Sequence, residues 1–258
     1  MRTAGAVELA ISGGVAAVLF KRPELQNAMT FAMYDQLARA CAQISEDNSV
    51  RAVIFRGAGD AFVAGTDINE FRDFKTAEDG INYERRIDAT VELVERIAVP
   101  TLAVVTGAAM GGGFVLAAAC DLRLATPRAR FGVPIARTVG NCLSMASTAR
   151  LVAALGVSRA KRMLLLAHTM EAEEAVACGF ALEIVAPAEI ARRAADLAGV
   201  LCSSAPITLR VVKEAIRRLA LSGLANGDDL VRTAYGSNDF NEGVCAFLEK
   251  RAPVWTAT

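Results

Sequence analysis

The sequence has few of the residues that build several common kinds of site. It contains one histidine, one tryptophan and six cysteines in 258 residues. No Cys-x-x-Cys pair occurs, so we expect no metal site and interpret the cysteines as reduced, mostly buried residues of a cytoplasmic protein. The formal net charge is zero, which removes the electrostatic argument for binding nucleic acid or an anionic membrane.

Charge is also absent from one long stretch, residues 98–120. This stretch is long enough to span a bilayer. However, Pro100 and four glycines interrupt it, and it changes from β-branched to alanine-rich halfway along. We therefore expect a buried strand, a turn and a helix, and no membrane partner. No signal peptide is expected either, because Glu8 interrupts the apolar opening.

The hydrophobic content of 53% is enough for a full core. Over the first 130 or so residues, apolar periodicity alternates between strand and helix, which predicts a layered α/β fold. The expected strands are 7–11, 15–20, 52–56, 101–106 and 122–126, and the expected helices are 30–47, 77–97 and 113–120. Later residues predict one strand, 182–185, among helices 147–155, 158–167, 171–178, 189–203, 206–221, 228–235 and 241–250.

Two segments are built from small residues next to expected strands and helices. Residues 62–68 follow a strand-like run, and residues 107–114 form a glycine run between a strand and a helix. Small residues allow a ligand to approach bare backbone, and a helix N-terminus offers unpaired N–H groups. Together they predict an oxyanion hole. Neither supplies an obvious catalytic carboxylate, and we interpret Asp67 as the cap of a short following helix.

These segments resemble motifs of the crotonase (enoyl-CoA hydratase/isomerase) superfamily. The resemblance covers nearly the whole chain and is carried by four motifs in order: residues 20–23 with 27–28, residues 61–68, residues 111–113 with 120–123, and residues 242–251. It implies a spiral of ββα units over residues 1–195, and a helical oligomerisation region over residues 196–258 that forms a trimer or a dimer of trimers. It also implies acyl-CoA thioester ligands and no cofactor beyond their CoA moiety.

By the same resemblance, the backbone N–H groups of Ala64 and Gly112 would hold the thioester oxygen. The loop of residues 64–68 would cradle the adenine, and Lys21, Arg22 and Lys250 would bind the CoA phosphates, Lys250 from a neighbouring subunit. The expected substrate-binding residues are Lys21, Arg22, Leu25, Ala64, Gly65, Thr66, Asp67, Ile68, Met110, Gly111, Gly112, Val115, Pro134, Ile135, Asn141 and Lys250.

The sequence departs from the family pattern at both usual catalytic glutamates. Hydratases of the family place one glutamate two residues after the glycine run and another after a Phe-x-x-Pro motif. Here those positions are Val115 and Ile135. Loss of general acid–base help costs about 10²–10⁴-fold per group. The acyl end could instead be lined by polar residues of the following segment, but structural roles are favoured for them, as for His168. They are Arg137, Thr138, Asn141, Cys142 and Ser144.

Two classes of function remain open. The first is an acyl-CoA enzyme that uses the oxyanion hole for a step needing little protein base, such as decarboxylation or thioester hydrolysis, with ordinary hydratase activity doubtful. The second is a catalytically silent acyl-CoA-binding paralogue. Neither the acyl chain nor the reaction follows from the sequence.

Overall fold

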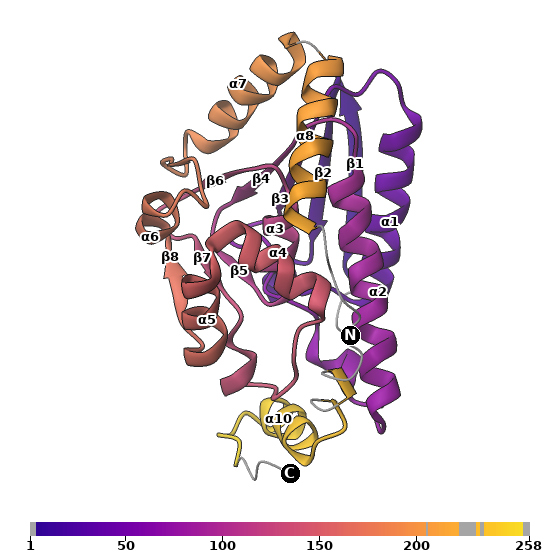
Figure 1. Ribbon diagram of the computed structural model, residues 1–258, viewed down its shortest axis with the longest axis vertical. Helices are drawn as coiled ribbons and strands as arrows, with labels where there is room; N and C mark the ends of the chain where they lie inside the picture. Colours follow the sequence, from indigo (N-terminus) through magenta and orange to yellow (C-terminus); the bar gives the residue numbers. More distant parts are fainter. Residues whose placement is uncertain (1–3, 205, 222–230, 233–234, 255–258) are drawn as a thin grey trace.

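The computed structural model describes residues 4–204, 206–221, 231–232 and 235–254. Six strands form one sheet in the order β1-β2-β3-β4-β6-β9 (Figure 1). Their bounds are β1 Ala6–Ser12, β2 Val15–Lys21, β3 Ala52–Gly57, β4 Thr101–Val105, β6 Leu122–Ala125 and β9 Glu183–Ile184. Within this sheet, as described, β1 and β2 are the one antiparallel pair; a two-glycine turn joins them, and both glycines adopt positive φ. The other pairs are parallel, as alternation of strands and helices predicts.

A second sheet of three short strands was not predicted. It has the order β5-β7-β8, with bounds β5 Ala108–Met110, β7 Arg130–Gly132 and β8 Thr169–Glu171. Each strand has three residues, which is too short for a period of two to stand out. The expectation of only one strand after residue 144 was therefore wrong, since β8 lies there. The glycine run follows β5 directly and is held to this small sheet. Gly111 N–H donates to the carbonyl of Gly132, the last residue of β7, which pairs with β5.

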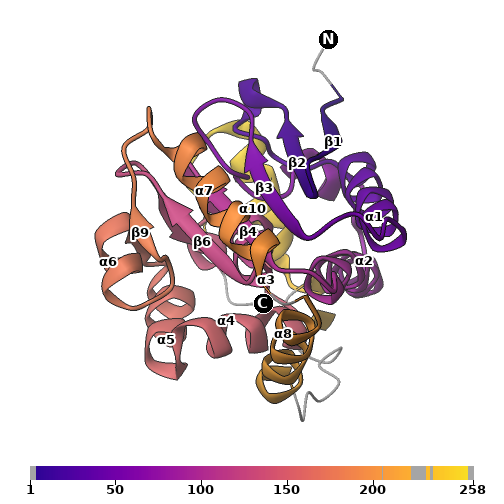
Figure 2. The same cartoon turned by 90° about the horizontal axis from the view of Figure 1, so that it is seen from above.

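Three helices of the first half match their predicted ranges closely. They are α1 Phe31–Glu46, α2 Ala77–Arg96 and α3 Gly112–Ala119. The Thr30 hydroxyl caps α1 by accepting a hydrogen bond from Met33 N–H, as predicted, and Thr76 with Asp79 forms a capping box on α2. Figure 2 shows α1 and α2 beside the β1–β3 end of the sheet. Three short 3₁₀ helices, η1 Pro23–Leu25, η2 Ile68–Phe71 and η3 Pro134–Arg137, lie in the connections.

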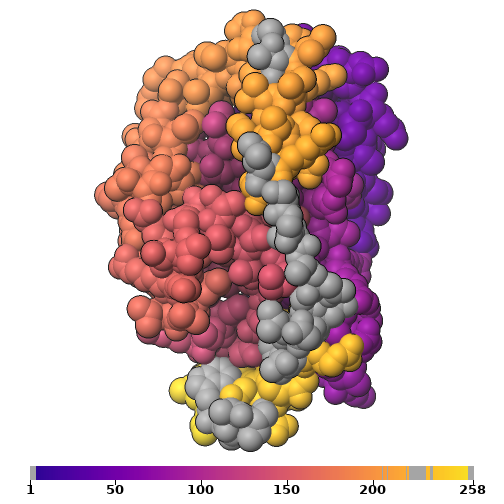
Figure 3. Space-filling model, in the orientation of Figure 1, coloured from indigo at the N-terminus to yellow at the C-terminus, as the bar shows by residue number. Residues whose placement is uncertain are grey.

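Helices dominate the second half, as expected. Their bounds are α4 Met145–Leu155, α5 Val157–Leu166, α6 Ala172–Ala177, α7 Ile190–Ser203, α8 Pro206–Leu221 and α10 Asn238–Glu249. The predicted helix 228–235 lies mostly outside the described residues. Trp255, the single tryptophan, lies wholly outside them. The predicted boundary at residue 195 falls inside α7, which packs on β3 and β4 of the core. In Figures 1 and 3 α10, in yellow, lies at the opposite end of the molecule from α7.

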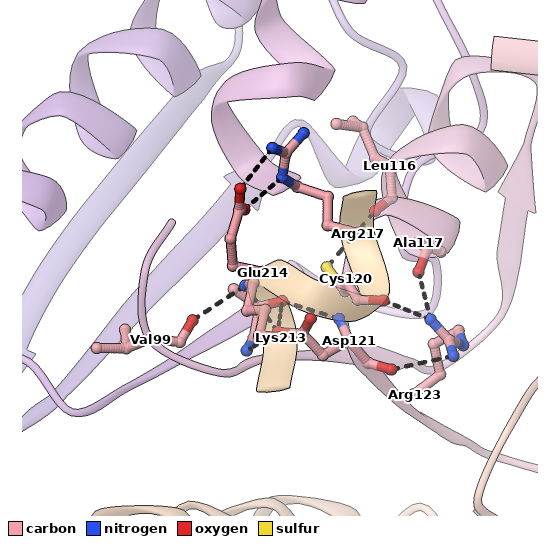
Figure 4. Close-up of polar contacts among 10 residues, drawn as sticks. Val99, Leu116, Ala117, Cys120, Asp121, Arg123, Lys213, Glu214 and Arg217 are labelled. Carbon is pink, nitrogen blue, oxygen red and sulfur yellow. Dashed lines mark hydrogen bonds and ion pairs between the residues drawn. The ribbon is translucent and has the colours of Figure 1, made fainter. Parts of the chain in front are cut away.

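Helix α8 is fastened to the sheet through the partly buried Lys213 (Figure 4). Lys213 Nζ donates to the Val99 carbonyl at 3.0 Å and lies 2.7 Å from Asp121 Oδ2. Asp121 also accepts hydrogen bonds from Thr101 N–H and Oγ1–H, which fix the backbone at the start of β4. Helix α8 is thus tied to the sheet at the point where the neighbouring strands β4 and β6 begin.

The charge-free stretch of residues 98–120 forms β4, β5 and α3, as expected. Among the helices of the described residues, none has both the length and the apolar character required to cross a bilayer.

Candidate functional site

The two predicted small-residue segments meet at one cavity of about 670 Å³. Segments from both halves of the chain line it: η1, the loop after β3, η2, α2, the glycine run, η3, the loop before α4, and the end of α10. Of the sixteen residues expected to bind substrate, all but Lys21 and Arg22 lie in this lining. The sequence motifs therefore identified a real concave site.

Asn27 holds the first segment in place. Its side chain is fully buried; Nδ2 donates to the carbonyls of Ala58 and Ala61 at 2.9 Å, and Oδ1 accepts from Arg22 N–H at 2.8 Å. These bonds satisfy backbone groups of a loop that would otherwise be buried without partners. The loop following β3 is consequently fixed against the end of β2.

The second segment is placed by glycines that no other residue could replace without movement. A Cβ on Gly113 would lie 2.0 Å from the Val63 carbonyl oxygen, so the start of α3 packs directly on the first segment. Gly65 and Gly111 both have positive φ, 110° and 52°, and a Cβ on Gly111 would lie 3.9 Å from Gly65 Cα. The backbones of the two segments therefore face each other across the cavity.

The structure changes one of the two predicted N–H donors. Ala64 N–H already donates to the Gln26 carbonyl at 3.0 Å, which is the physical reason that it is unavailable to a ligand. Among the described residues, Thr66 N–H and Gly112 N–H donate to no protein acceptor, and both residues line the cavity. Gly112 is the first residue of α3, where an N–H has no partner within the helix. The Thr66 side chain is fixed between Tyr34 and Tyr83, whose hydroxyls lie 2.9 and 2.8 Å from its Oγ1.

Two predicted phosphate ligands lie elsewhere. Arg22 is 3% exposed and pairs with Asp67 at 2.8 Å, so its charge is committed to the fold. Lys21 pairs with Glu8 on the exposed face of the β1–β2 hairpin, outside the cavity lining. Arg22 is therefore not available to a ligand, whereas the role expected of Lys21 stays a prediction. Lys250 lines the cavity of its own chain, and its expected contribution to a neighbouring subunit stays a prediction.

Asp67 caps the short helix that follows it, as interpreted from the sequence. Its Oδ1 accepts from Asn69 N–H at 2.9 Å. Although partial burial opposes ionisation, the hydrogen bonds from Asn69 and Arg22 lower the pKa of Asp67 below its ordinary value. A carboxylate held ionised by two donors is a poor proton-transfer group at neutral pH.

The wall beyond the two free N–H groups is mainly apolar. Val115, 1% exposed, and the partly buried Ile135 both face the cavity, together with Ile87, Val139 and Leu143. The aliphatic side chains at the two positions singled out by sequence thus form part of the pocket surface.

One carboxylate interrupts this apolar wall, and sequence reasoning missed it. Glu84, on α2, is 4% exposed and lines the cavity. Its Oε1 accepts from the Tyr235 hydroxyl at 2.7 Å, and its Oε2 accepts from Ser144 N–H at 3.0 Å. Asn141 Nδ2 donates to the same Tyr235 hydroxyl at 3.1 Å, while the buried Asn141 Oδ1 has no hydrogen-bond partner among the described residues.

Burial sets the protonation of this carboxyl group. Desolvation raises the pKa of Glu84 to about 8, and the hydrogen bonds from Tyr235 and Ser144 offset only part of that rise. Arg150 pairs with Asp88 at 3.2 Å and with Glu95 at 2.8 Å. Asp88 also accepts from the Ser144 and Ser147 hydroxyls, so it is fully engaged. Within the described part of the chain, Glu84 thus has no ion pair with a cation.

The remaining candidates have the structural roles favoured for them. His168 Nε2 lies 2.8 Å from Glu174 Oε2, and neither residue lines the cavity. Burial raises the pKa of Cys142 to about 12, which disfavours a nucleophilic thiolate. Arg137 is exposed on η3. None of the described residues forms a group of three or more possible metal ligands.

A sequence signal for Glu84 did exist. Along α2 the buried residues Ile87, Val91 and Val94 recur at helical spacing, and Glu84 occupies the preceding position of the same face. A carboxylate at an apolar position of an amphipathic helix predicts a buried ionisable group, which makes that residue a candidate for a functional role. Its contacts with Ser144 and Tyr235, 60 and 151 residues away, follow only from the fold.

Comparison with known proteins agrees with this geometry. A family model described as "Enoyl-CoA hydratase/isomerase" matches residues 10–258. The chain is 33% identical over 247 residues to the short-chain-enoyl-CoA hydratase of Clostridium acetobutylicum, covering 93% of each chain.

Solved structures give the same result. An enoyl-CoA hydratase/carnithine racemase from Magnetospirillum magneticum superposes with a TM-score of 0.80 at 32% identity, covering 98% of this chain and 96% of that one. A methylmalonyl CoA decarboxylase complexed with 2S-carboxypropyl CoA superposes with a TM-score of 0.88 at 25% identity, covering 98% of both chains. The same backbone therefore carries proteins with more than one named reaction.

Proposed function

Because the chain belongs to the enoyl-CoA hydratase/isomerase family, we propose that its cavity binds acyl-CoA thioesters and stabilises negative charge on the thioester oxygen. The observation that carries this proposal is the pair of free backbone donors, Thr66 N–H and Gly112 N–H, on facing segments of one cavity. Two such donors act on charge that develops during reaction, and each is worth about 10²–10³-fold in rate.

The rest of the cavity suits the parts of such a ligand. The loop of residues 64–68 offers backbone to an adenine edge, and Lys250 lies at the exposed rim for a phosphate. The apolar wall around Val115 and Ile135 suits a short acyl group. No metal and no cofactor beyond the CoA moiety is part of the proposal.

Calorimetry with acetyl-CoA and free CoA tests this function. We expect micromolar binding of both, because the loop and Lys250 contact the shared nucleotide. Absence of heat at about millimolar ligand would show that the cavity does not bind CoA. Replacing Thr66 by proline would remove one donor and should lower turnover of any thioester substrate more than binding.

The reaction is proposed to differ from ordinary hydration. Hydration requires one group to deprotonate water and another to protonate C2, and Val115 and Ile135 can do neither. We expect hydration of crotonyl-CoA far below the usual enzymatic range of about 1–10³ per second. Turnover within that range would contradict this part of the proposal. A catalytically silent, CoA-binding protein is the second candidate, favoured by the aliphatic wall, and any turnover on enoyl-, malonyl- or acyl-CoA would exclude it.

A homotrimer, or a dimer of trimers, in the cytoplasm completes the proposal. The oligomer is supported by apolar side chains of α8 that are exposed and that no described residue covers. They are Ile207, Val211, Val212 and Ile216. A stable monomer in light scattering at dilute concentration would refute it.

A further inference from the structure

Glu84 is an unexplained feature of the proposed active site. Burying an ionisable carboxyl group without a cation is costly, and the described contacts of Glu84 are two hydrogen bonds that leave it between the cavity and the core. Helix α2 keeps it there, because Tyr83, the preceding residue, is hydrogen-bonded to Thr66 Oγ1 and therefore fixes this turn of α2 against the oxyanion segment.

We propose that Glu84 is the catalytic residue that removes and returns a proton at C2 of a thioester held by Thr66 N–H and Gly112 N–H. This inference rests on the proposed function, and it adds a proton-transfer group supplied by a helix instead of by the two usual motif positions. The substrate class is an acyl-CoA with a hydrogen on C2.

The step balances without any further reactant. The Glu84 carboxylate takes the C2 proton, and the electron pair of that C–H bond becomes the C1=C2 bond of an enolate. The carbonyl pair moves onto the thioester oxygen, where the two N–H groups stabilise it. In the reverse direction the carboxyl group returns a proton to C2 and the carbonyl re-forms.

Tyr235 and Asn141 are positioning residues in this scheme. The Tyr235 hydroxyl donates to Glu84 Oε1 and so favours the ionised form that acts as base. Asn141 Nδ2 donates to the Tyr235 hydroxyl and orients it, while the buried Asn141 Oδ1 has no partner among the described residues. Burial of Glu84 places its pKa near neutrality, which suits a general base.

Exchange of the C2 hydrogens of butyryl-CoA in D₂O, followed by NMR, tests the proposal. The wild-type protein should catalyse exchange, and Glu84→Gln should slow it by at least about 100-fold, with the Kd for CoA changed less than twofold. The matched control is Glu95→Gln. Glu95 is on the same helix and its side chain is 10% exposed, but it pairs with Arg150 and does not line this cavity, so exchange should persist.

Each outcome decides the proposal. Wild-type binding of CoA without exchange would overturn the role of Glu84 and leave the proposed binding function intact. Failure of both would overturn both. Equal exchange rates in Glu84→Gln and wild type would assign the proton transfer to another group.

A second variant supplies a readout that a purely structural role would not move. The rate of C2 exchange should rise with pH as Glu84 ionises. The titratable groups that interact with Glu84 are Asp88 on α2, the hydroxyls of Tyr34, Tyr83 and Tyr235, and the thiol of Cys142. Tyr235→Phe removes a donor to the carboxylate, so the midpoint of the profile should move to higher pH. An unmoved midpoint would overturn the positioning role of Tyr235.

Discussion

The two ends of the cavity are built in different ways. The end proposed to hold the thioester consists of backbone from two short segments, residues 62–68 and 107–114, and the small residues of each segment determine its geometry. The end proposed to hold the acyl group consists of side chains, and its polar centre joins Glu84 of α2, Asn141 before α4 and Tyr235 before α10.

This difference explains what each end can tolerate. Backbone donors depend on close packing, since Gly113 leaves no space for a Cβ against Val63. Side-chain groups can be exchanged one at a time without moving the chain. A fold of this kind can therefore keep charge stabilisation at one end while its proton chemistry changes at the other.

The largest expected effect comes from breaking the backbone end. Gly113→Ala places a methyl group 2.0 Å from the Val63 carbonyl oxygen, so α3 must move away from the first segment. We expect thioester turnover to fall by at least about 10²-fold, because the donor pair is separated, together with a lower Tm. The measurements are steady-state kinetics and thermal unfolding.

Gly199→Ala is the control for that substitution. A Cβ at Gly199 in α7 would meet nothing within 4 Å. Alanine is favoured over glycine in helices by up to about 1 kcal/mol, so stability should rise slightly and turnover should not change. If both alanine variants behaved alike, close packing at the glycine run would not be what maintains the site.

The same contrast decides how much could be predicted from sequence. The parallel strands, the helices and the thioester end were predictable because hydrophobic period and glycine runs are local signals. The Ala64 donor was misassigned because the Gln26 carbonyl that engages it belongs to another loop. Arg22 was misassigned because its partner Asp67 lies 45 residues away. Glu84 was missed for the same reason, although its place on the buried face of α2 was visible.

The next largest effect is a pH dependence of stability that belongs to the acyl end. The pKa of Glu84 is raised from 4.5 to about 8 in the folded protein, so the unfolded state releases this proton at lower pH than the folded state does. The contribution of Glu84 to the free energy of unfolding is fully present below pH 4.5 and is lost as the pH rises towards 8. The loss approaches about 1.4 kcal/mol per pH unit within that window.

Glu84→Gln should remove this slope. The variant should match the wild type in free energy of unfolding near pH 5 and exceed it by a few kcal/mol near pH 8, as measured by urea denaturation at several pH values. Taking the difference between the two proteins cancels the titration of all other groups that the substitution leaves alone. A difference that stays constant with pH would show that Glu84 titrates normally.

The smallest expected effect is at the rim, where the exposed Lys250 is proposed to meet a phosphate of CoA. An exposed charge pair contributes about 0.2–1 kcal/mol, so Lys250→Gln should weaken CoA binding by roughly 1.5- to 5-fold, and less as salt is added. Lys21→Gln is the matched control: Lys21 was expected to share this role but pairs with Glu8 away from the cavity. Its substitution should leave the Kd from calorimetry unchanged. Equal weakening by both variants would mean that CoA is bound by general positive charge, whereas weakening by Lys21→Gln alone would return the phosphate site to the β1–β2 hairpin.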